Sequence, residues 1–244
     1  WRKPPQLPAT HWMAVAATGI LGYHISSLLD FAGLRHISAG LERLVLFTYP
    51  TLVLLLSAGL FHQKIMPRQW LAVAISYAGI ALAFFGEYAS IGGSDTGPLI
   101  EGVLLVFGCA FTYGSYIVAG AKLIPRTGPA LFNSVSMLAA CFGVLLHQLV
   151  GGSVDLNSLP AEAWYYGFLM AIFSTVIPSF LIAESMRRIG GENTAIIASI
   201  GPVSTLFMAW WLLGEPVTVL QVIGTAAILA GIWLVANTGI RRLD

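Results

Sequence analysis

The stretch ISAGLERLVLFTYPTLVLLLSAGLF, residues Ile37–Phe61, decides the fold of this chain. It is apolar over a length that can cross the hydrocarbon core of a bilayer, which takes about 20 residues of α-helix. Its two charged residues, Glu42 and Arg43, stand near its start, and Pro50 stands near its middle. We therefore predict a membrane-spanning helix over residues 38–61.

Apolar segments of similar length lie on both sides of this helix. Charged residues make up 9% of the chain and apolar residues 57%, with a mean hydropathy of +0.81. A soluble chain carries about 25% charge, so most of this surface must face lipid. The segments are longer than the roughly 10-residue strands of a membrane β-barrel. We predict an all-α membrane protein whose eight transmembrane helices span residues 12–34, 38–61, 67–88, 98–121, 129–150, 162–186, 192–213 and 217–237.

The basic residues are distributed unevenly among the short loops. If the chain starts in the cytoplasm and crosses eight times, all of the twelve Lys and Arg residues except Arg35 and Arg43 fall on the cytoplasmic side. The opposite loops hold acidic residues instead. An excess of Lys and Arg in short loops marks the cytoplasmic side of a membrane protein. We therefore expect both termini to be cytoplasmic.

The sequence also contains an internal repeat. It matches itself without gaps at an offset of 152 residues, which places five crossings between corresponding helices. Five is an odd number, so the two copies must have opposite orientations. Inverted repeats are typical of secondary transporters, although a channel or an inert scaffold could share the arrangement. The most informative matched pairs are Trp12/Trp164, Arg35/Arg187, Pro50/Pro202 and Gln69/Gln221.

The two copies differ in the number of predicted helices. We assign residues 1–90 to a partial first repeat of three helices and residues 98–240 to a second repeat of five helices. The partners of the helices at 98–121 and 129–150 would precede residue 1. We therefore expect that two helices of the full repeat are absent from this chain.

Several segments resemble a known family of permeases. The stretch Ile37–Phe61, the later GIALAFFG at Gly79–Gly86 and the whole of Arg187–Val235, with its LLGEP turn at Leu212–Pro216, resemble the EamA-type permeases of the drug/metabolite transporter superfamily. The chain departs from the family pattern at Phe61–Ile65, where FHQKI replaces a usual Gly-Glu, and in lacking the first two of ten helices. The resemblance implies a bacterial inner-membrane exporter of amino acids or related small metabolites.

The resemblance further implies a central cavity with polar residues from both halves. Its walls would come from the helices at 12–34, 38–61, 98–121, 162–186 and 192–213, with one more helix absent here. In the sequence, hydroxyl and carboxylate residues share single helix faces at spacings of three and four, although such faces can also serve helix packing. The candidate substrate or coupling residues are Ser27, Asp30, Glu42, Arg43, Tyr49, Tyr113, Tyr116, Ser174, Thr175 and Ser179, with helix bends at Pro50, Pro178 and Pro202.

The ionisable residues inside the predicted spans are functional candidates, because each is costly in a bilayer. Glu42 and Arg43 are sequence neighbours, so they point about 100° apart on a helix. We therefore expect Arg43 to pair with Asp30 of the preceding helix. Glu42 would then share a stripe with Tyr49 and bind a substrate amine or a coupling proton. The alternative is that Glu42 complements the positive N-terminal end of its helix.

The sequence does not favour an enzyme. It contains no G-x-x-x-x-G-K-[ST] loop for ATP and no Cys or His spacing typical of a metal site, so we expect no catalytic residue, cofactor or metal. An intramembrane enzyme or a membrane receptor or assembly subunit remains the alternative. The expected partners are a small-molecule substrate and the lipid bilayer, without nucleic acid. A small-residue face that includes Gly224 and Gly231 could pack on a helix of this chain or of a second copy.

Cysteine labelling tests the predicted sidedness. Cysteines placed at Asp95 and Asp155 should react with an impermeant reagent in intact cells, because both loops are expected to be periplasmic. A cysteine at Lys122 should react only after permeabilisation. Labelling of the Lys122 position in intact cells would contradict the predicted topology.

Overall fold

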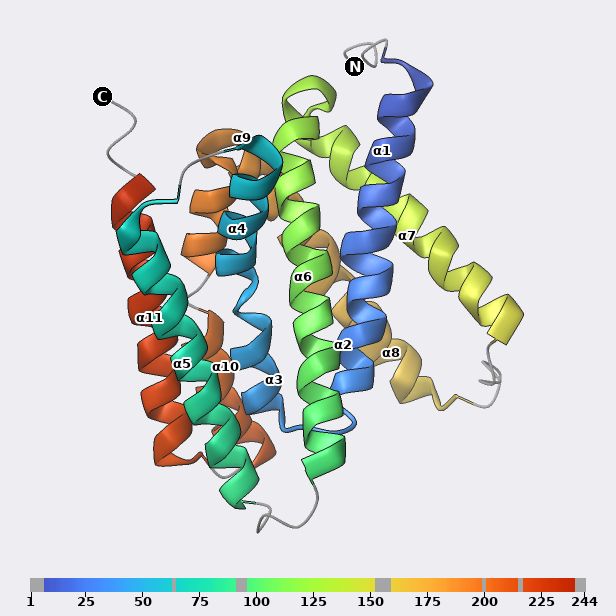
Figure 1. Cartoon of the computed structure of the whole chain (residues 1–244). Helices are drawn as coiled ribbons and strands as arrows, with labels where there is room; N and C mark the ends of the chain where they lie inside the picture. The colour runs from blue at the N-terminus through green and yellow to red at the C-terminus, as the bar shows by residue number, and fades with distance from the viewer. Residues whose placement is uncertain are drawn as a thin grey trace.

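The computed structural model describes residues 7–62, 65–90, 96–151, 159–198, 201–214 and 217–239, and these residues form helices and short connections without a strand (Figure 1). The predicted all-α class is therefore confirmed. Three π-helical segments, named η, interrupt the α-helices. The elements in chain order are α1 (Ala9–Gly19), η1 (Ile20–Ile25), α2 (Ser26–Gly33), α3 (Ala39–Leu46), α4 (Tyr49–Phe61), α5 (Pro67–Ser90), α6 (Thr96–Thr127), α7 (Pro129–Gly151), α8 (Ala161–Leu169), η3 (Met170–Val176), α9 (Ile177–Ala198), α10 (Gly201–Met208), η4 (Ala209–Leu213) and α11 (Val219–Gly239).

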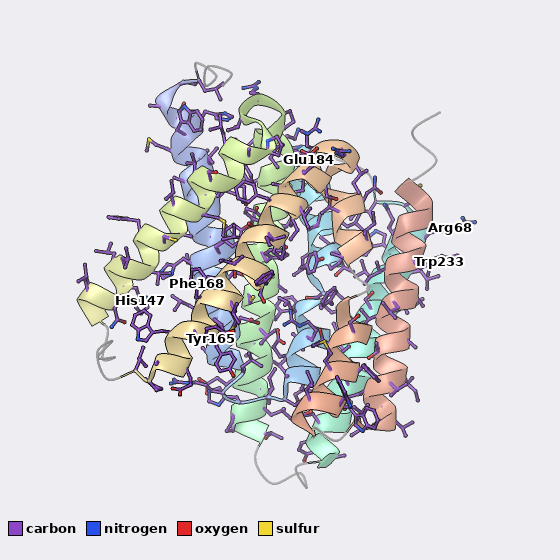
Figure 2. The ribbon with its side chains drawn as sticks, turned by 180° about the vertical axis from the view of Figure 1, so that it is seen from behind. Arg68, His147, Tyr165, Phe168, Glu184 and Trp233 are labelled. Carbon is purple, nitrogen blue, oxygen red and sulfur yellow. The ribbon has the colours of Figure 1, made fainter. Side chains whose placement is uncertain are left out.

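Six continuous helical stretches of the described chain are long and apolar enough to cross a membrane, and the apolar helix Val219–Leu234 is shorter. The predicted span 192–213 comprises the end of α9, α10 and η4, and its residues 199 and 200 lie outside the described residues. Large apolar side chains cover the outside of the bundle, and α8 has no buried residue. Figure 2 shows Tyr165 and Phe168 of α8 on the side seen from behind. The chain is thus a multi-pass membrane protein.

The long helix α6 forms the centre of the fold. It contacts α1, α2, α3, α4, α7 and α9, and it buries side chains along most of its length. In Figure 1, the start of α1 and the end of α11 lie at the same end of the bundle. The basic residues Lys122 and Arg126 stand in the part of α6 near that end, whereas Glu101 stands near the opposite end of the helix. Which end faces the cytoplasm stays a prediction, and Asp95 and Asp155 lie outside the described residues.

The predicted bend at Pro50 is a complete break between two helices. The helix α3 ends at Leu46, and α4 begins at Tyr49 with Pro50 in its first turn. Proline has no N–H and fits the first turn of a helix, where that N–H would lack a partner in any case. The Thr48 hydroxyl donates to the Val45 carbonyl at 2.9 Å, and the Thr51 hydroxyl donates to the Thr48 carbonyl at 2.7 Å.

The matching position of the second copy, residues 199 and 200, lies outside the described residues. The described part of α9 ends at Ala198, and α10 begins at Gly201 with Pro202 as its second residue. The start of α10 lies against the break of the first copy, because a Cβ atom added at Gly201 would lie 2.6 Å from Cζ of Phe47. The two prolines therefore stand at matched helix starts, near the point where the two copies meet.

Pro178 is associated with a different kind of distortion. The π-helical segment η3 ends at Val176, directly before the α-helical turn that contains Pro178. The matching part of the first copy, η1, is also π-helical, although Ser26 stands where the second copy has Pro178. The proline is therefore not required for the π-helical turn. Such turns widen a helix locally and often occur at functional sites.

The helices α5 and α11 pack closely along one side of the bundle (Figure 1). A Cβ atom added at Gly79 would lie 2.6 Å from the carbonyl oxygen of Gly224, and one added at Gly231 would lie 2.7 Å from the carbonyl oxygen of Ala72. The offset of 152 residues relates Gly79 to Gly231 and Ala72 to Gly224, so the two contacts are equivalent in the repeat. The small-residue face of α11 therefore packs on α5 of the same chain. The two contacts are related to each other as a pseudo-two-fold axis between the repeats requires.

The matched glutamines begin these two helices. The Gln69 side chain accepts a hydrogen bond from the Met66 N–H at 2.8 Å, and the Gln221 side chain accepts one from the Thr218 N–H at 2.9 Å. In α11 the bond is reciprocated, because the Thr218 hydroxyl accepts from the Gln221 N–H. This is a capping box, which satisfies backbone donors at a helix start. The repeat thus preserves a local structural function at both positions.

The close α5–α11 contact gives a stability test. Gly79→Ala should lower the free energy of unfolding by about 1–3 kcal/mol, because the new methyl group would overlap the backbone of α11. Gly59→Ala is the matched control, since nothing lies within 4 Å of a Cβ atom at that helical glycine. It should leave stability unchanged or raise it slightly. Unfolding in detergent measures the stability of both variants. Equal effects would contradict the close contact between α5 and α11.

Candidate functional site

A cavity of about 380 Å³ opens beside the break between α3 and α4. This volume lies in the lower part of the range of small-molecule sites, which is about 300–1,000 Å³. Residues from both copies of the repeat form its wall. The lining residues are Tyr23, Ser26, Ser27, Asp30, Arg43, Leu46, Phe47, Tyr49, Cys109, Tyr113, Ser174, Thr175, Pro178, Ser179, Ile182 and Ala198.

The distorted segments position four of these side chains. Tyr23 belongs to η1, Ser174 and Thr175 belong to η3, and Phe47 stands in the break after α3. All five helical regions that the family resemblance implied contribute to the wall, since Ala198 lies within the predicted span 192–213. The cavity is therefore built where both copies depart from regular α-helix.

Four tyrosine rings form a continuous row beside the cavity. The rings of Tyr49 and Tyr113 meet edge to face at 5.1 Å, and those of Tyr113 and Tyr116 stack at 5.9 Å. The ring of Tyr116 in turn lies 5.1 Å from the ring of Tyr23. Tyr116 is fully buried and does not line the cavity, unlike the other three. It supports the aromatic wall from behind.

A hydrogen-bond network behind the wall centres on Asn133 of α7. The Tyr23 hydroxyl donates to Asn133 Oδ1 at 3.3 Å, and Asn133 Nδ2 donates to the Ser179 hydroxyl at 3.0 Å. Ser179 then donates to the Val176 carbonyl at 2.7 Å. The Tyr23 and Tyr116 hydroxyls are 3.1 Å apart. Asn133 thus fixes two cavity-lining hydroxyls, one from each copy of the repeat.

Sequence analysis did not identify Asn133. It is fully buried in α7, a helix that was not expected to line the cavity. An amide inside an apolar helix is a signal in itself, because a buried amide needs hydrogen-bond partners. The partners, however, come from η1 and α9, which are far away in the sequence. Their proximity is a property of the folded chain.

The charged residues are arranged differently from the prediction. Arg43 pairs with its sequence neighbour, with Arg43 Nε 3.5 Å from Glu42 Oε2, and no Asp30–Arg43 ion pair is found among the described residues. The long arginine side chain can fold back along α3, which the argument from helix angles alone did not consider. Glu42 is almost fully buried in the first turn of α3 and does not line the cavity. Its position fits the alternative that it complements the helix N-terminus.

The structure thus gathers eight of the ten candidate residues around one cavity, with Glu42 and Tyr116 behind its wall. A further ionisable residue, Glu184 of α9, accepts hydrogen bonds from Arg187 and Arg188 in its own helix. It lies toward the upper end of the bundle in Figure 2, away from this cavity. Among the described residues, no group of three or more His, Cys, Asp or Glu side chains is arranged to hold a metal ion.

A smaller cavity of about 250 Å³ lies nearer the end of the bundle where α4 terminates. Its wall includes Lys122, whose ammonium group lies 4.0 Å from the centre of the Phe61 ring. Val53 and Ser57 of α4 also line it, together with Gly190, which has a positive φ of 81° in the kink of α9. The helix α4 therefore separates two cavities at different depths of the bundle.

Comparison with known proteins gives consistent matches over the chain. Residues 1–85 and 100–237 match the EamA-like transporter family. The uncharacterized transporter YcbK of Bacillus subtilis (strain 168) is 31% identical over 222 residues, which cover 89% of this chain and 69% of that protein. A protein of Escherichia coli (strain K12) named "Probable amino-acid metabolite efflux pump" is 25% identical and covers 88% of this chain and 75% of its own length.

A solved structure shares the fold. It has a TM-score of 0.65 and 22% sequence identity, and the match covers 98% of this chain and 79% of that chain. This similarity concerns the arrangement of the helices alone.

Asn133→Leu tests the network behind the wall. The substitution keeps the side chain at a similar size but leaves the Tyr23 and Ser179 hydroxyls without their amide partner, so we expect a loss of about 1–3 kcal/mol in unfolding free energy. Asn193→Leu is the control, because the Asn193 amide donates to the Ile189 carbonyl of its own helix. Unfolding in detergent compares the two variants. An equal loss would show that the cross-helix network carries no special stability.

Proposed function

Because the chain belongs to the EamA-like transporter family, we propose that it is a secondary-active transporter that exports amino acids or related small metabolites. The observation that carries this proposal is the cavity beside the break between α3 and α4. It brings hydroxyl groups and aromatic rings from both copies, together with the charged Asp30 and Arg43 of the first copy, into one space within the bundle. Secondary transporters bind their substrates near the midplane, between inverted repeats and beside interrupted helices.

Alternating access supplies the mechanism in this proposal. Two oppositely oriented repeats can reach two states of similar energy by exchanging their conformations around a fixed site. Three features support such a two-fold relation: the matched starts of α4 and α10 with Pro50 and Pro202, the paired π-helical segments, and the reciprocal Gly79 and Gly231 contacts. The smaller cavity near Lys122 lies nearer the end of the bundle where α4 terminates. We propose that it is part of the cytoplasmic pathway.

The direction, substrate and energy source are further parts of the proposal. Export of amino acids or related metabolites is supported by the printed name of the Escherichia coli relative. The sequence has no P-loop motif, so an ion or proton gradient would provide the energy. The uneven distribution of Lys and Arg supports a location in the bacterial inner membrane with both termini in the cytoplasm.

Counterflow in proteoliposomes tests the proposed function. Vesicles that contain the purified protein and an unlabelled amino acid should accumulate the same labelled amino acid without ATP. Thr175→Trp should abolish this uptake, because the bulky ring would occupy the cavity that Thr175 lines. Phe173→Trp is the matched control, since Phe173 is exposed on the outside of the same segment. A panel of amino acids and small metabolites that gave no counterflow would contradict transport by this chain.

A further inference from the structure

The cavity contains two opposite charges that do not satisfy each other. Asp30 and Arg43 both line it, yet no ion pair joins them among the described residues. The buried Oδ1 atom of Asp30 and the buried Nε atom of Arg43 have no hydrogen-bond partner. Buried charges are normally paired or hydrogen-bonded, because an apolar environment does not solvate them. Both side chains therefore line the cavity, and each has a buried polar atom without a hydrogen-bond partner in the protein.

Glu42 does not remove this imbalance. The Glu42 carboxylate oxygen Oε2 lies 3.5 Å from Arg43 Nε. At this distance the two atoms form an ion pair, but Arg43 Nε does not donate a hydrogen bond. A guanidinium group has five N–H donors in a planar fork, so an ion pair on one side leaves donors for a second carboxylate. Glu42 is buried behind the wall, whereas Arg43 reaches the cavity. Arg43 can therefore be held by Glu42 and bind an anionic group of a ligand.

A ligand with a single charge would satisfy half of this site. A simple amine could bind Asp30 but would leave the Arg43 donor unpaired, and a simple carboxylate would leave the Asp30 acceptor unpaired. A molecule that carries an ammonium group and a carboxylate close together provides a partner for each residue. Free amino acids have both groups on one carbon atom, which suits two charged side chains on the wall of one small cavity.

We propose that Asp30 and Arg43 select zwitterionic amino acids, with the ammonium group at Asp30 and the carboxylate at Arg43. This inference rests on the proposed function and specifies the substrate class of the same site. The hydroxyls of Ser26 and Ser27 lie on the same helical face as Asp30 and line the cavity beside it. These hydroxyls can accept a hydrogen bond from the ammonium group of the ligand or donate one to its carboxylate.

The rest of the wall indicates the type of amino acid. Leu46, Phe47 and Ile182 contribute apolar surface, and Tyr49 and Tyr113 contribute aromatic rings. Asp30 and Arg43 are the charged residues among those that line the cavity, so a charged ligand side chain would have no further counter-ion there. An apolar side chain would instead be favoured by the aliphatic and aromatic surface. Neutral amino acids with apolar side chains, such as leucine, are therefore the expected class.

A set of leucine analogues tests the charge selection without any mutation. Leucinamide keeps the amine but lacks the carboxylate, and N-acetyl-leucine keeps the carboxylate but lacks the amine. Ligand-induced stabilisation of the purified protein in detergent measures binding of each compound. Leucine should bind at least about tenfold more tightly than either analogue, because a site built for a polar group rejects a ligand that lacks it. Equal binding of leucine and either analogue would overturn the proposal.

Two variants assign the charges to the residues. Asp30→Asn should remove the preference for leucine over N-acetyl-leucine and keep the preference over leucinamide. Arg43→Gln should have the reverse effect. Arg35→Gln is the control, because Arg35 is exposed and does not line the cavity. A variant that weakened the binding of all three compounds equally would overturn the assignment. If a variant does not fold, the comparison of leucine with its analogues on the unmodified chain still tests the proposal.

The outcome separates this inference from the proposed function. Zwitterion-selective binding without counterflow in proteoliposomes would support the charge selection and contradict transport. Counterflow of leucine together with equal binding of leucinamide would support transport and overturn the charge selection.

Discussion

A helix that crosses a bilayer must satisfy its backbone hydrogen bonds within the protein, because the hydrocarbon core offers no water. The break between α3 and α4 is the place where this chain departs from a continuous helix, and the rest of the site depends on it. The Thr48 and Thr51 hydroxyls add hydrogen bonds to the Val45 and Thr48 carbonyls, which also accept backbone N–H bonds. Pro50 removes an N–H that would otherwise need a partner. The break brings Phe47 to the cavity wall and against the start of α10.

The close pairing of α5 and α11 gives the distorted helices a fixed neighbour. Glycines on both helices allow their backbones to approach, and the two contacts are related by the internal repeat. At one end of this pair, the Glu87 carboxylate accepts hydrogen bonds from the N–H and hydroxyl of Ser38 and from the Gln221 amide. These bonds tie the start of α3 to the α5–α11 pair. The broken helix is therefore anchored at one end while its break faces the cavity.

The polar groups of the bundle fall into two classes that have different physical roles. Glu42, Asn133 and Tyr116 are buried behind the cavity wall, where they hold other side chains in place. Asp30 and Arg43 reach the cavity itself and retain buried atoms without hydrogen-bond partners. The second class forms the proposed binding site for a ligand, because a buried group without a partner is costly. The sequence does not distinguish the two classes, because both consist of polar residues within apolar segments.

The sequence by itself determined the all-α membrane class, the location of most helices and the repeat, because helix length, apolar content and matched residues are local properties of the chain. Eight of its candidate residues line the cavity, and they were chosen by their spacing on helix faces or by their charge inside an apolar segment. Only the tertiary structure decided that Arg43 pairs with Glu42 and that Asn133 joins Tyr23 to Ser179. The reason is physical: a face defined by helical periodicity does not specify its neighbour, and long side chains choose partners by three-dimensional proximity.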